Sequence, residues 1–128
     1  MAKWASSLAL RGGLDYVKAN TTAMWLISSY TAGESYSTIQ ARILASVTTS
    51  SADFTLATGS ASSETLTTAS KTDPLADANG GGATNHIAFV NTAGSAVLLV
   101  TPESSGQTIT INNPIVIGPI VYTIPQPG

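Results

Sequence analysis

The sequence HIAFVNTAGSAVLLV, residues 86–100, decides the fold class of this chain. Two apolar runs, 86–90 and 96–100, flank Asn91-Thr92-Ala93-Gly94-Ser95, whose length and glycine are typical of a β-hairpin turn. Each run is apolar at successive positions and bounded by turn residues, which favours a strand buried on both faces. The segment therefore predicts an antiparallel pair at the centre of the structure.

Downstream of this hairpin, the chain continues with strand signals. Residues 107–111, QTITI, alternate strictly, so we expect Ile109 and Ile111 to point inward and the threonines outward. Asn112-Asn113-Pro114 turns the chain, and residues 115–124 predict a last strand. Gly118-Pro119 interrupts it, because proline cannot donate to a strand ladder.

Upstream, the apolar run Ala23–Ser28 has strand length and predicts a buried, central strand. Residues 53–57 and 64–70 alternate more weakly and predict exposed strands. Residues 71–83 are rich in Asp, Asn, Pro and Gly without apolar periodicity, which indicates a surface loop.

Two short helices are expected in the N-terminal half. Leu14, Val17 and their neighbours up to Asn20 have roughly helical spacing. Residues 35–46 place Ile39 and Ile43 on one face, with Ser35 or Ser37 available as the N-cap.

Together these signals predict a mainly β protein with about six strands. We expect an antiparallel β-sandwich, jelly-roll or immunoglobulin-like, with one or two short helices in the N-terminal half. Its 128 residues suit one domain. We assign residues 1–12 to an N-terminal arm and residues 13–128 to a single β-rich domain.

The surface is expected to be hydroxyl-rich rather than ionic. Charged residues make up 9% of the chain, against roughly a quarter in ordinary globular domains. The 16 serines and 18 threonines fill that gap, and threonine favours strands. A surface with so little charge is typical of a protein that packs against other protein chains.

Most chemical functions lack the residues they need. There is no cysteine and one histidine, His86, so thiolate sites and two-histidine metal sites are excluded, and no G-x-S-x-G motif accompanies that histidine. Asp73 and Asp77 share a loop but lack the spacing of a calcium loop. We therefore predict no enzyme activity, no catalytic residue, no metal and no cofactor, and we interpret His86 as a partly exposed strand residue.

Charge and hydropathy also limit the partners. A net charge of −2 with five basic residues argues against nucleic acid. The two long uncharged stretches contain Gly80-Gly81-Gly82 or several prolines, so neither predicts a membrane-spanning helix.

Aromatic and terminal residues are the candidates for protein contacts. Trp25 lies within an apolar run and is assigned to the core. The candidate interface residues are Trp4 in the arm, Tyr30, Tyr36, Pro125 and Pro127. For Trp4 and the tyrosines, packing on their own domain and contact with a neighbour remain open alternatives.

Five segments that together span nearly the whole chain are MAKW (1–4), LDYVKANT (14–21), SSADFTL (50–56), ATNHIAFV (83–90) and residues 109–125. In these segments the chain resembles a group of short proteins encoded by tailed bacteriophages. Members of that group are similar to head decoration, or cement, proteins, which bind the outside of the capsid lattice, often as trimers. Ser63-Glu64-Thr65 departs from the Gly-Arg-Lys that members often show before a strand.

The resemblance implies a structural virion protein on the capsid surface, present in the host cytoplasm during assembly. Its implied partners are the major capsid protein and further copies of itself, with a homotrimer favoured. Two alternatives are a receptor- or carbohydrate-binding β-sandwich of a tail fibre, for which Asp77, Asn79 and Asn85 would supply polar groups, and a head–tail or tail structural subunit.

Overall fold

A computed structural model describes residues 6–58 and 63–125 of the chain. The helices are α1 (Ser7–Asn20), α2 (Tyr36–Gln40) and the 3-10 turn η1 (Ser51–Asp53). The strands are β1 (Ala23–Ile27), β2 (Ile43–Thr48), β3 (Phe54–Thr58), β4 (Glu64–Thr68), β5 (Lys71–Asp73), β6 (Gly80–Gly81), β7 (His86–Asn91), β8 (Ala96–Pro102), β9 (Thr108–Ile109), β10 (Ile115–Ile117) and β11 (Val121–Ile124). The fold is mainly β with antiparallel pairing and two helices in the N-terminal half, as the sequence predicts.

The first layer is a four-stranded sheet in the order β2-β1-β7-β8. All five residues of β1 are buried, which confirms the central strand expected at residues 23–28. β7 and β8 form the expected hairpin, with Phe89 paired to Leu99 and a bulge where Val90 pairs with Val97. Apolar residues on both faces of β1 and β7 are explained by layers on both sides of this sheet.

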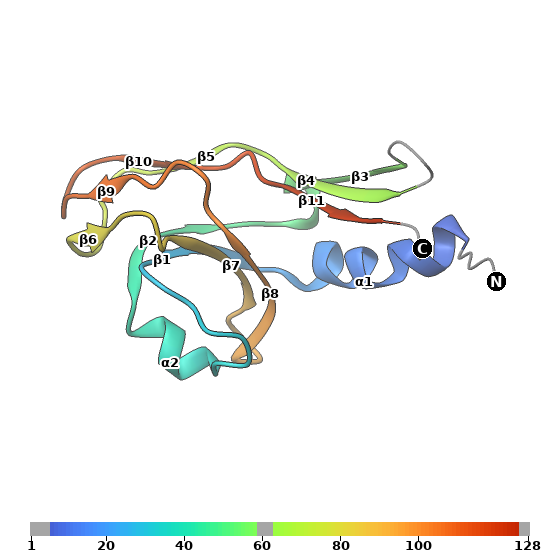
Figure 1. The fold of residues 1–128 in the computed structure, drawn as a ribbon, viewed down its shortest axis with the longest axis horizontal. Coiled ribbons are helices and arrows are strands. Elements are labelled where there is room, and N and C mark those ends of the chain that lie inside the picture. Colours follow the sequence, from blue (N-terminus) through green and yellow to red (C-terminus); the bar gives the residue numbers. More distant parts are fainter. Residues whose placement is uncertain (1–5, 59–62, 126–128) are drawn as a thin grey trace.

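The second layer consists of three small antiparallel sheets, in the orders β11-β4-β3, β10-β5 and β6-β9. It lies above the four-stranded sheet and extends along the long axis of the molecule (Figure 1). The predicted interruption at Gly118-Pro119 is confirmed, because β10 ends at Ile117 and β11 begins at Val121. Thr68 bridges the break, with its hydroxyl accepting the backbone N–H of Ile120 at 2.9 Å.

The main core fills the space between the two layers. Met24, Leu26 and Phe89 of the first layer face Leu66 and Phe54 of the second, and each of these side chains is buried. The rings of Phe54 and Phe89 lie 5.9 Å apart between centroids. Burial of this kind is the dominant favourable contribution to the stability of the sandwich.

A smaller core covers the other face of the four-stranded sheet. Trp25 and Ile27 point toward α2, where Ile39 is fully buried, and Trp25 is 4% exposed, so its assignment to the core is confirmed. Ser35 is the N-cap of α2 and its hydroxyl accepts the N–H of Thr38. One of the two N-caps expected from the sequence is thus in place.

Helix α1 projects beyond the first sheet and packs beneath β3 and β4 (Figure 1). It starts at Ser7, seven residues before the start expected at Leu14, with the Ser6 hydroxyl accepting the N–H of Ala9. Leu14 and Val17 are its buried contacts with the core. Because α1 runs through residues 12 and 13, no change of secondary structure marks the expected boundary between arm and domain.

Four local expectations are wrong. Residues 43–48 form β2 rather than the end of a helix, because this segment pairs with β1. Residues 71–83 are not only loop, since β5 and β6 lie there. Ile111 is 43% exposed, although Ile109 is buried as expected. Residues 64–68 are not simply exposed, because Glu64, Leu66 and Thr68 face the interior.

Among the described residues, no helix is long and apolar enough to cross a membrane.

Candidate interaction surface

The charged side chains of the described residues serve mainly to join elements. The Arg11 guanidinium of α1 lies 2.9 Å from the fully buried carboxylate of Glu64 in β4. Arg42 pairs with Glu34 at 2.7 Å across the loop around α2. The Arg42 side chain, with the N–H of Thr31, lowers the pKa of Glu34, so the carboxylate stays ionised. The first pair positions α1 on β4, and the second joins the segments on either side of α2.

Asp53 and Lys71 tie the second layer together in the same way. The Asp53 carboxylate accepts the backbone N–H of Ser50 at 2.8 Å and lies 3.1 Å from the Lys71 ammonium. The Ser50 hydrogen bond, followed by Lys71, lowers the pKa of Asp53. The Ser50 hydrogen bond caps η1, which precedes β3, and the Lys71 pair links η1 to the start of β5.

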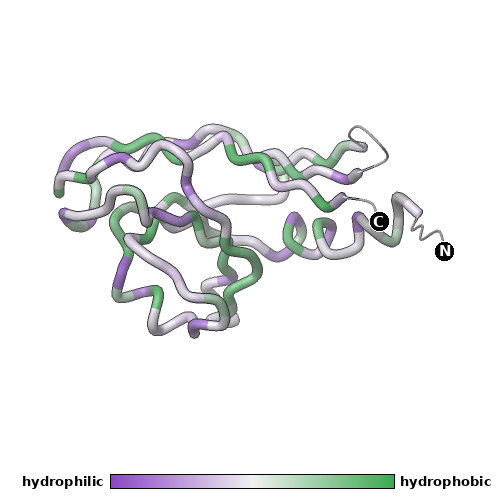
Figure 2. The backbone as a smooth tube through the Cα atoms, viewed as in Figure 1, coloured by the Kyte–Doolittle hydropathy of each residue, from purple (hydrophilic) through white to green (hydrophobic). Residues whose placement is uncertain are grey.

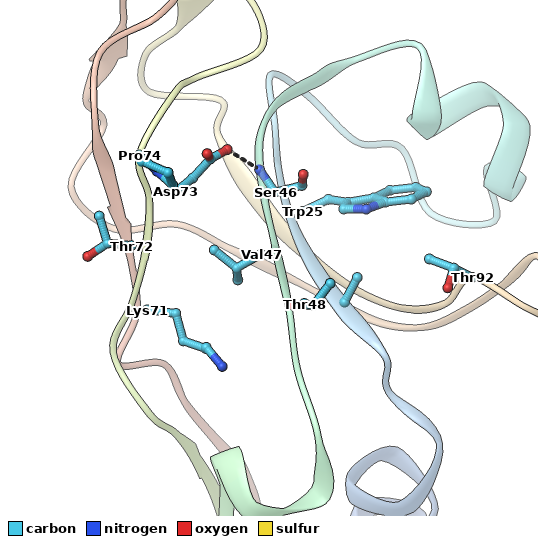
Figure 3. Close-up of a pocket in the computed structure, with 10 residues that line it drawn as sticks. Trp25, Ser46, Val47, Thr48, Lys71, Thr72, Asp73, Pro74 and Thr92 are labelled. Atoms are coloured by element: carbon cyan, nitrogen blue, oxygen red, sulfur yellow. Dashed lines mark hydrogen bonds between the residues drawn. The ribbon is translucent and has the colours of Figure 1, made fainter.

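A hollow of about 460 Å³ lies between the outer edge of β2 and β5 (Figure 3). The Asp73 carboxylate points from β5 toward β2, where it accepts the N–H of Ser46 at 2.9 Å, and its other oxygen accepts the N–H of Leu75 at 3.0 Å. The hydrogen bond from Ser46 to Asp73 joins the two layers, whereas the pair of Lys71 with Asp53 lies within the second layer.

The residues that the structure describes do not bring together three or more His, Cys, Asp or Glu side chains in a way that could hold a metal ion. His86 opens β7, is half-buried, and its Nδ1 lies 2.7 Å from the carbonyl oxygen of Thr84. Its interpretation as a partly exposed strand residue is confirmed.

The most distinctive surface is the outer face of the β11-β4-β3 sheet, which we call the threonine face. Cross-strand pairing arranges it in two rows, Val121-Thr67-Thr55 and Thr123-Thr65-Ala57. None of these six side chains is charged, and Thr55, Ala57, Val121 and Thr123 are exposed. The inner face of the same sheet packs on α1 and the core, so the threonine face is backed by a fixed layer.

The same face extends past the break at Gly118-Pro119. Val116 of β10 is 54% exposed and pairs with exposed Thr72 of β5, and Leu75 just beyond is 58% exposed. Figure 2 shows apolar segments at β10 and β8 among pale stretches of small and hydroxyl-bearing residues. A surface depleted of charge and mounted on paired strands is typical of the centre of a protein–protein interface.

The residues proposed from sequence as contacts are dispersed. Tyr36 packs on Trp25 with ring centroids 4.9 Å apart, and the Tyr30 hydroxyl accepts the N–H of Gly33 at 3.2 Å. Both lie on the α2 side, whereas exposed Pro125 follows β11 in the other layer. Trp4 and Pro127 lie outside the described residues. The structure thus shows no single site formed by the described members of this set.

Sequence reasoning missed the threonine face, although a signal for it was present. The alternation of Thr65 and Thr67 with Leu66 indicates a strand with one hydroxyl face. The threonines become a surface because β3 and β11 flank this strand in register. That pairing joins segments distant in the sequence, so no local pattern indicates it.

The comparisons with known proteins add no relative. No family model, no curated protein and no solved structure matches this chain.

Two of the three polar loop residues suggested for carbohydrate binding have internal roles. Asn85 is 1% exposed, and its amide accepts the N–H of Gly82 and donates to the carbonyl of Gln107. The Asn79 side chain accepts the N–H of Ile111 at 2.7 Å. Asp77 is exposed, and among the described residues its side chain makes no such hydrogen bond.

Proposed function

We propose that this protein is a structural component of a tailed-phage virion that binds the outer surface of the capsid as a decoration protein. The observation that carries the proposal is the threonine face, an exposed and uncharged sheet surface backed by the core. The resemblance of the sequence to phage decoration proteins supports the choice of the major capsid protein as the partner.

The physical requirements of such a role match this surface. A decoration protein repeats the same contact over a symmetric lattice, so many modest contacts add up without a deep pocket. Threonine hydroxyls donate and accept hydrogen bonds, and their methyl groups bury apolar area, without the desolvation cost of charged groups. The threonine face offers both kinds of contact over three strands.

The direct test adds purified protein to expanded capsids that lack it and measures occupancy by gel densitometry and cryo-electron microscopy. Thr67→Lys places an ammonium at the centre of the threonine face, where no other charge of the face could neutralise it. We expect its affinity to fall about tenfold or more, which corresponds to about 1.4 kcal/mol.

Thr31→Lys is the matched control, because Thr31 is exposed on the α2 side of the molecule and its hydroxyl makes no hydrogen bond to a described residue. It should bind like the wild type. Equal occupancy of both variants would exclude the threonine face as the contact, and absence of wild-type binding would refute the decoration role itself.

A further inference from the structure

Asn79-Gly80 is the one place in the sequence where an asparagine precedes a glycine. The other five asparagines are followed by Thr, His, Thr, Asn and Pro. The backbone nitrogen after an asparagine can attack the carbon of its side-chain amide, because the product is a five-membered ring. A side chain on the following residue obstructs this approach, and glycine has none. The sequence therefore makes Asn79 the asparagine most open to this reaction.

The structure leaves the side chain of Asn79 accessible and oriented. It lies on an exposed bend directly before β6, at the end of the molecule opposite α1 (Figure 1). Its Oδ1 accepts the N–H of Ile111 at 2.7 Å, and its Nδ2 donates to no described residue. Attack on the amide carbon places negative charge on Oδ1, and an N–H that already points at this oxygen stabilises that charge. The nitrogen that has to leave is not held by a hydrogen bond to a described residue.

The backbone after Asn79 has the freedom that ring closure requires. Gly80, Gly81 and Gly82 all have positive φ angles, of 141°, 87° and 142°. β6 consists of the first two of these glycines and pairs with the two residues of β9, so local opening breaks few hydrogen bonds. The nitrogen of Gly80 is thus free to approach the Asn79 amide while the core stays folded.

Asn85 provides the internal comparison. Its side chain is buried, its Oδ1 accepts the N–H of Gly82 and its Nδ2 donates to the carbonyl of Gln107. The residue that follows it, His86, carries a side chain. Because both polar atoms of this amide are held and its carbon is covered, Asn85 should be inert in the folded protein.

We propose that Asn79 is a site of self-modification, converted to aspartate and isoaspartate with the Ile111 N–H as the stabilising donor. The nitrogen of Gly80 loses its proton to solvent and forms a bond to Cγ of Asn79. The bond from Cγ to Nδ2 breaks, and the nitrogen takes up a proton and leaves as ammonia. Water then opens the ring at Cγ to give aspartate, or at the main-chain carbonyl to give isoaspartate. One water is consumed for each ammonia released, with no oxidant or reductant.

The modification changes the charge of one end of the second layer. It adds a negative charge to a chain whose net charge is −2, beside the exposed Ile111. Aspartate keeps an oxygen that accepts the Ile111 N–H, whereas isoaspartate adds one atom to the main chain before β6. Both products accumulate with time, so this end of the molecule becomes more acidic as the protein ages. The reaction does not depend on binding to a capsid.

The test incubates the full-length protein at mildly alkaline pH, in buffer and in urea, and follows each asparagine by peptide mapping with mass spectrometry. We expect a gain of about 1 Da at residue 79 and isoaspartate that an isoaspartate methyltransferase labels. The rate at Asn79 in buffer should lie within about tenfold of that in urea, because the group is exposed and oriented. Asn85 should stay unmodified in buffer. Asn79→Gln keeps an amide but requires a larger ring, so it should gain no mass.

Ile111→Pro tests the stabilising donor. Residues 110–113 form a β-turn in which the N–H of Asn113 donates to the carbonyl of Thr110 at 3.2 Å and Asn112 has a φ of 69°. Proline is common at the second position of such a turn, so the variant removes the N–H of residue 111 and should keep the turn. Its rate at Asn79 should fall about threefold or more in buffer and match the wild type in urea.

Three results would overturn the proposal. No gain of mass at Asn79 in buffer, while it reacts in urea, would show that the folded chain blocks the attack. Equal rates at Asn79 and Asn85 in buffer would reject exposure as the cause. An unchanged or faster rate in Ile111→Pro would reject its N–H as the stabilising donor. Should that variant not fold, as judged by circular dichroism, the comparison of Asn79 with Asn85 in the wild type still decides the site.

Discussion

Glu64 shows at the scale of one residue how α1 is held. Its carboxylate is fully buried and accepts from both the Nε and the Nη2 of Arg11, while its other oxygen accepts the hydroxyl of Thr58 at 3.0 Å. A buried carboxylate is tolerated because these donors replace water. The pair also sets the position of α1 against β4.

Replacing Arg11 tests this role. Arg11→Met removes the cation from the buried carboxylate and should lower the free energy of unfolding by about 3 kcal/mol, as measured by urea denaturation at pH 7. The double variant Arg11→Met/Glu64→Leu should lose less, because no charge then remains buried. A single variant within about 0.5 kcal/mol of the wild type would contradict the interpretation. Lys18→Met is the control for a charge lost elsewhere on α1.

Asp53 predicts a pH dependence of stability. The Ser50 N–H and the Lys71 ammonium lower its pKa in the folded state, so its contribution is present above the unfolded pKa of about 4 and is lost as the pH falls through the folded value. Asp53→Asn should therefore be less stable than the wild type at pH 7, and the difference should shrink in acid. Urea titrations of both proteins across this range measure it, and a constant difference would contradict the assignment.

At the scale of elements, the strands and turns that a local sequence pattern specifies were predicted correctly. The hairpin β7–β8 and the central β1 were recognised because runs of apolar residues bounded by turn residues require little context. The spacing of Ile39, Ile43 and Leu44 fits a helix as well as a strand. Ile43 and Leu44 are in a strand because their segment pairs with β1. β6 consists of Gly80 and Gly81, which offer no side-chain pattern at all.

The candidate surface was less predictable than the fold. The rows of the threonine face join strands that are distant in the sequence, such as β3 and β11. The side-chain hydrogen bonds of Asn79 and Asn85 also join segments that are distant in the sequence. No local pattern shows whether a polar side chain is available to a ligand or is bonded to backbone.

Helix α1 carries a prediction at this scale. Gly12 and Gly13 lie inside it and are exposed, and a Cβ added at either would meet no atom within 4 Å. Gly12→Ala and Gly13→Ala should each raise the free energy of unfolding by about 0.5–1 kcal/mol, because alanine restricts the unfolded chain more than glycine. Thermal melts followed by circular dichroism test this, and a loss of stability would mean that the helix needs these glycines.

At the scale of the whole molecule, a continuous core spans both layers, so the small sheets of the second layer need not be stable alone. Phe89→Ala should lower the free energy of unfolding by about 3–5 kcal/mol, because its ring packs between the layers against Phe54. Unfolding should stay a single transition in fluorescence and circular dichroism. Two separate transitions would show that the layers are independent units.

The anchoring of α1 also has a geometric consequence for any assembly of this protein. Helix α1 has 14 residues and is anchored at its fifth residue by the pair of Arg11 with Glu64, so its length sets the distance of residue 6 from the first sheet. A neighbouring molecule that contacts the start of α1 would therefore lie at a distance from the first sheet that the length of α1 determines. Inserting one helical turn into α1 before Arg11 would then enlarge that distance by about 5 Å.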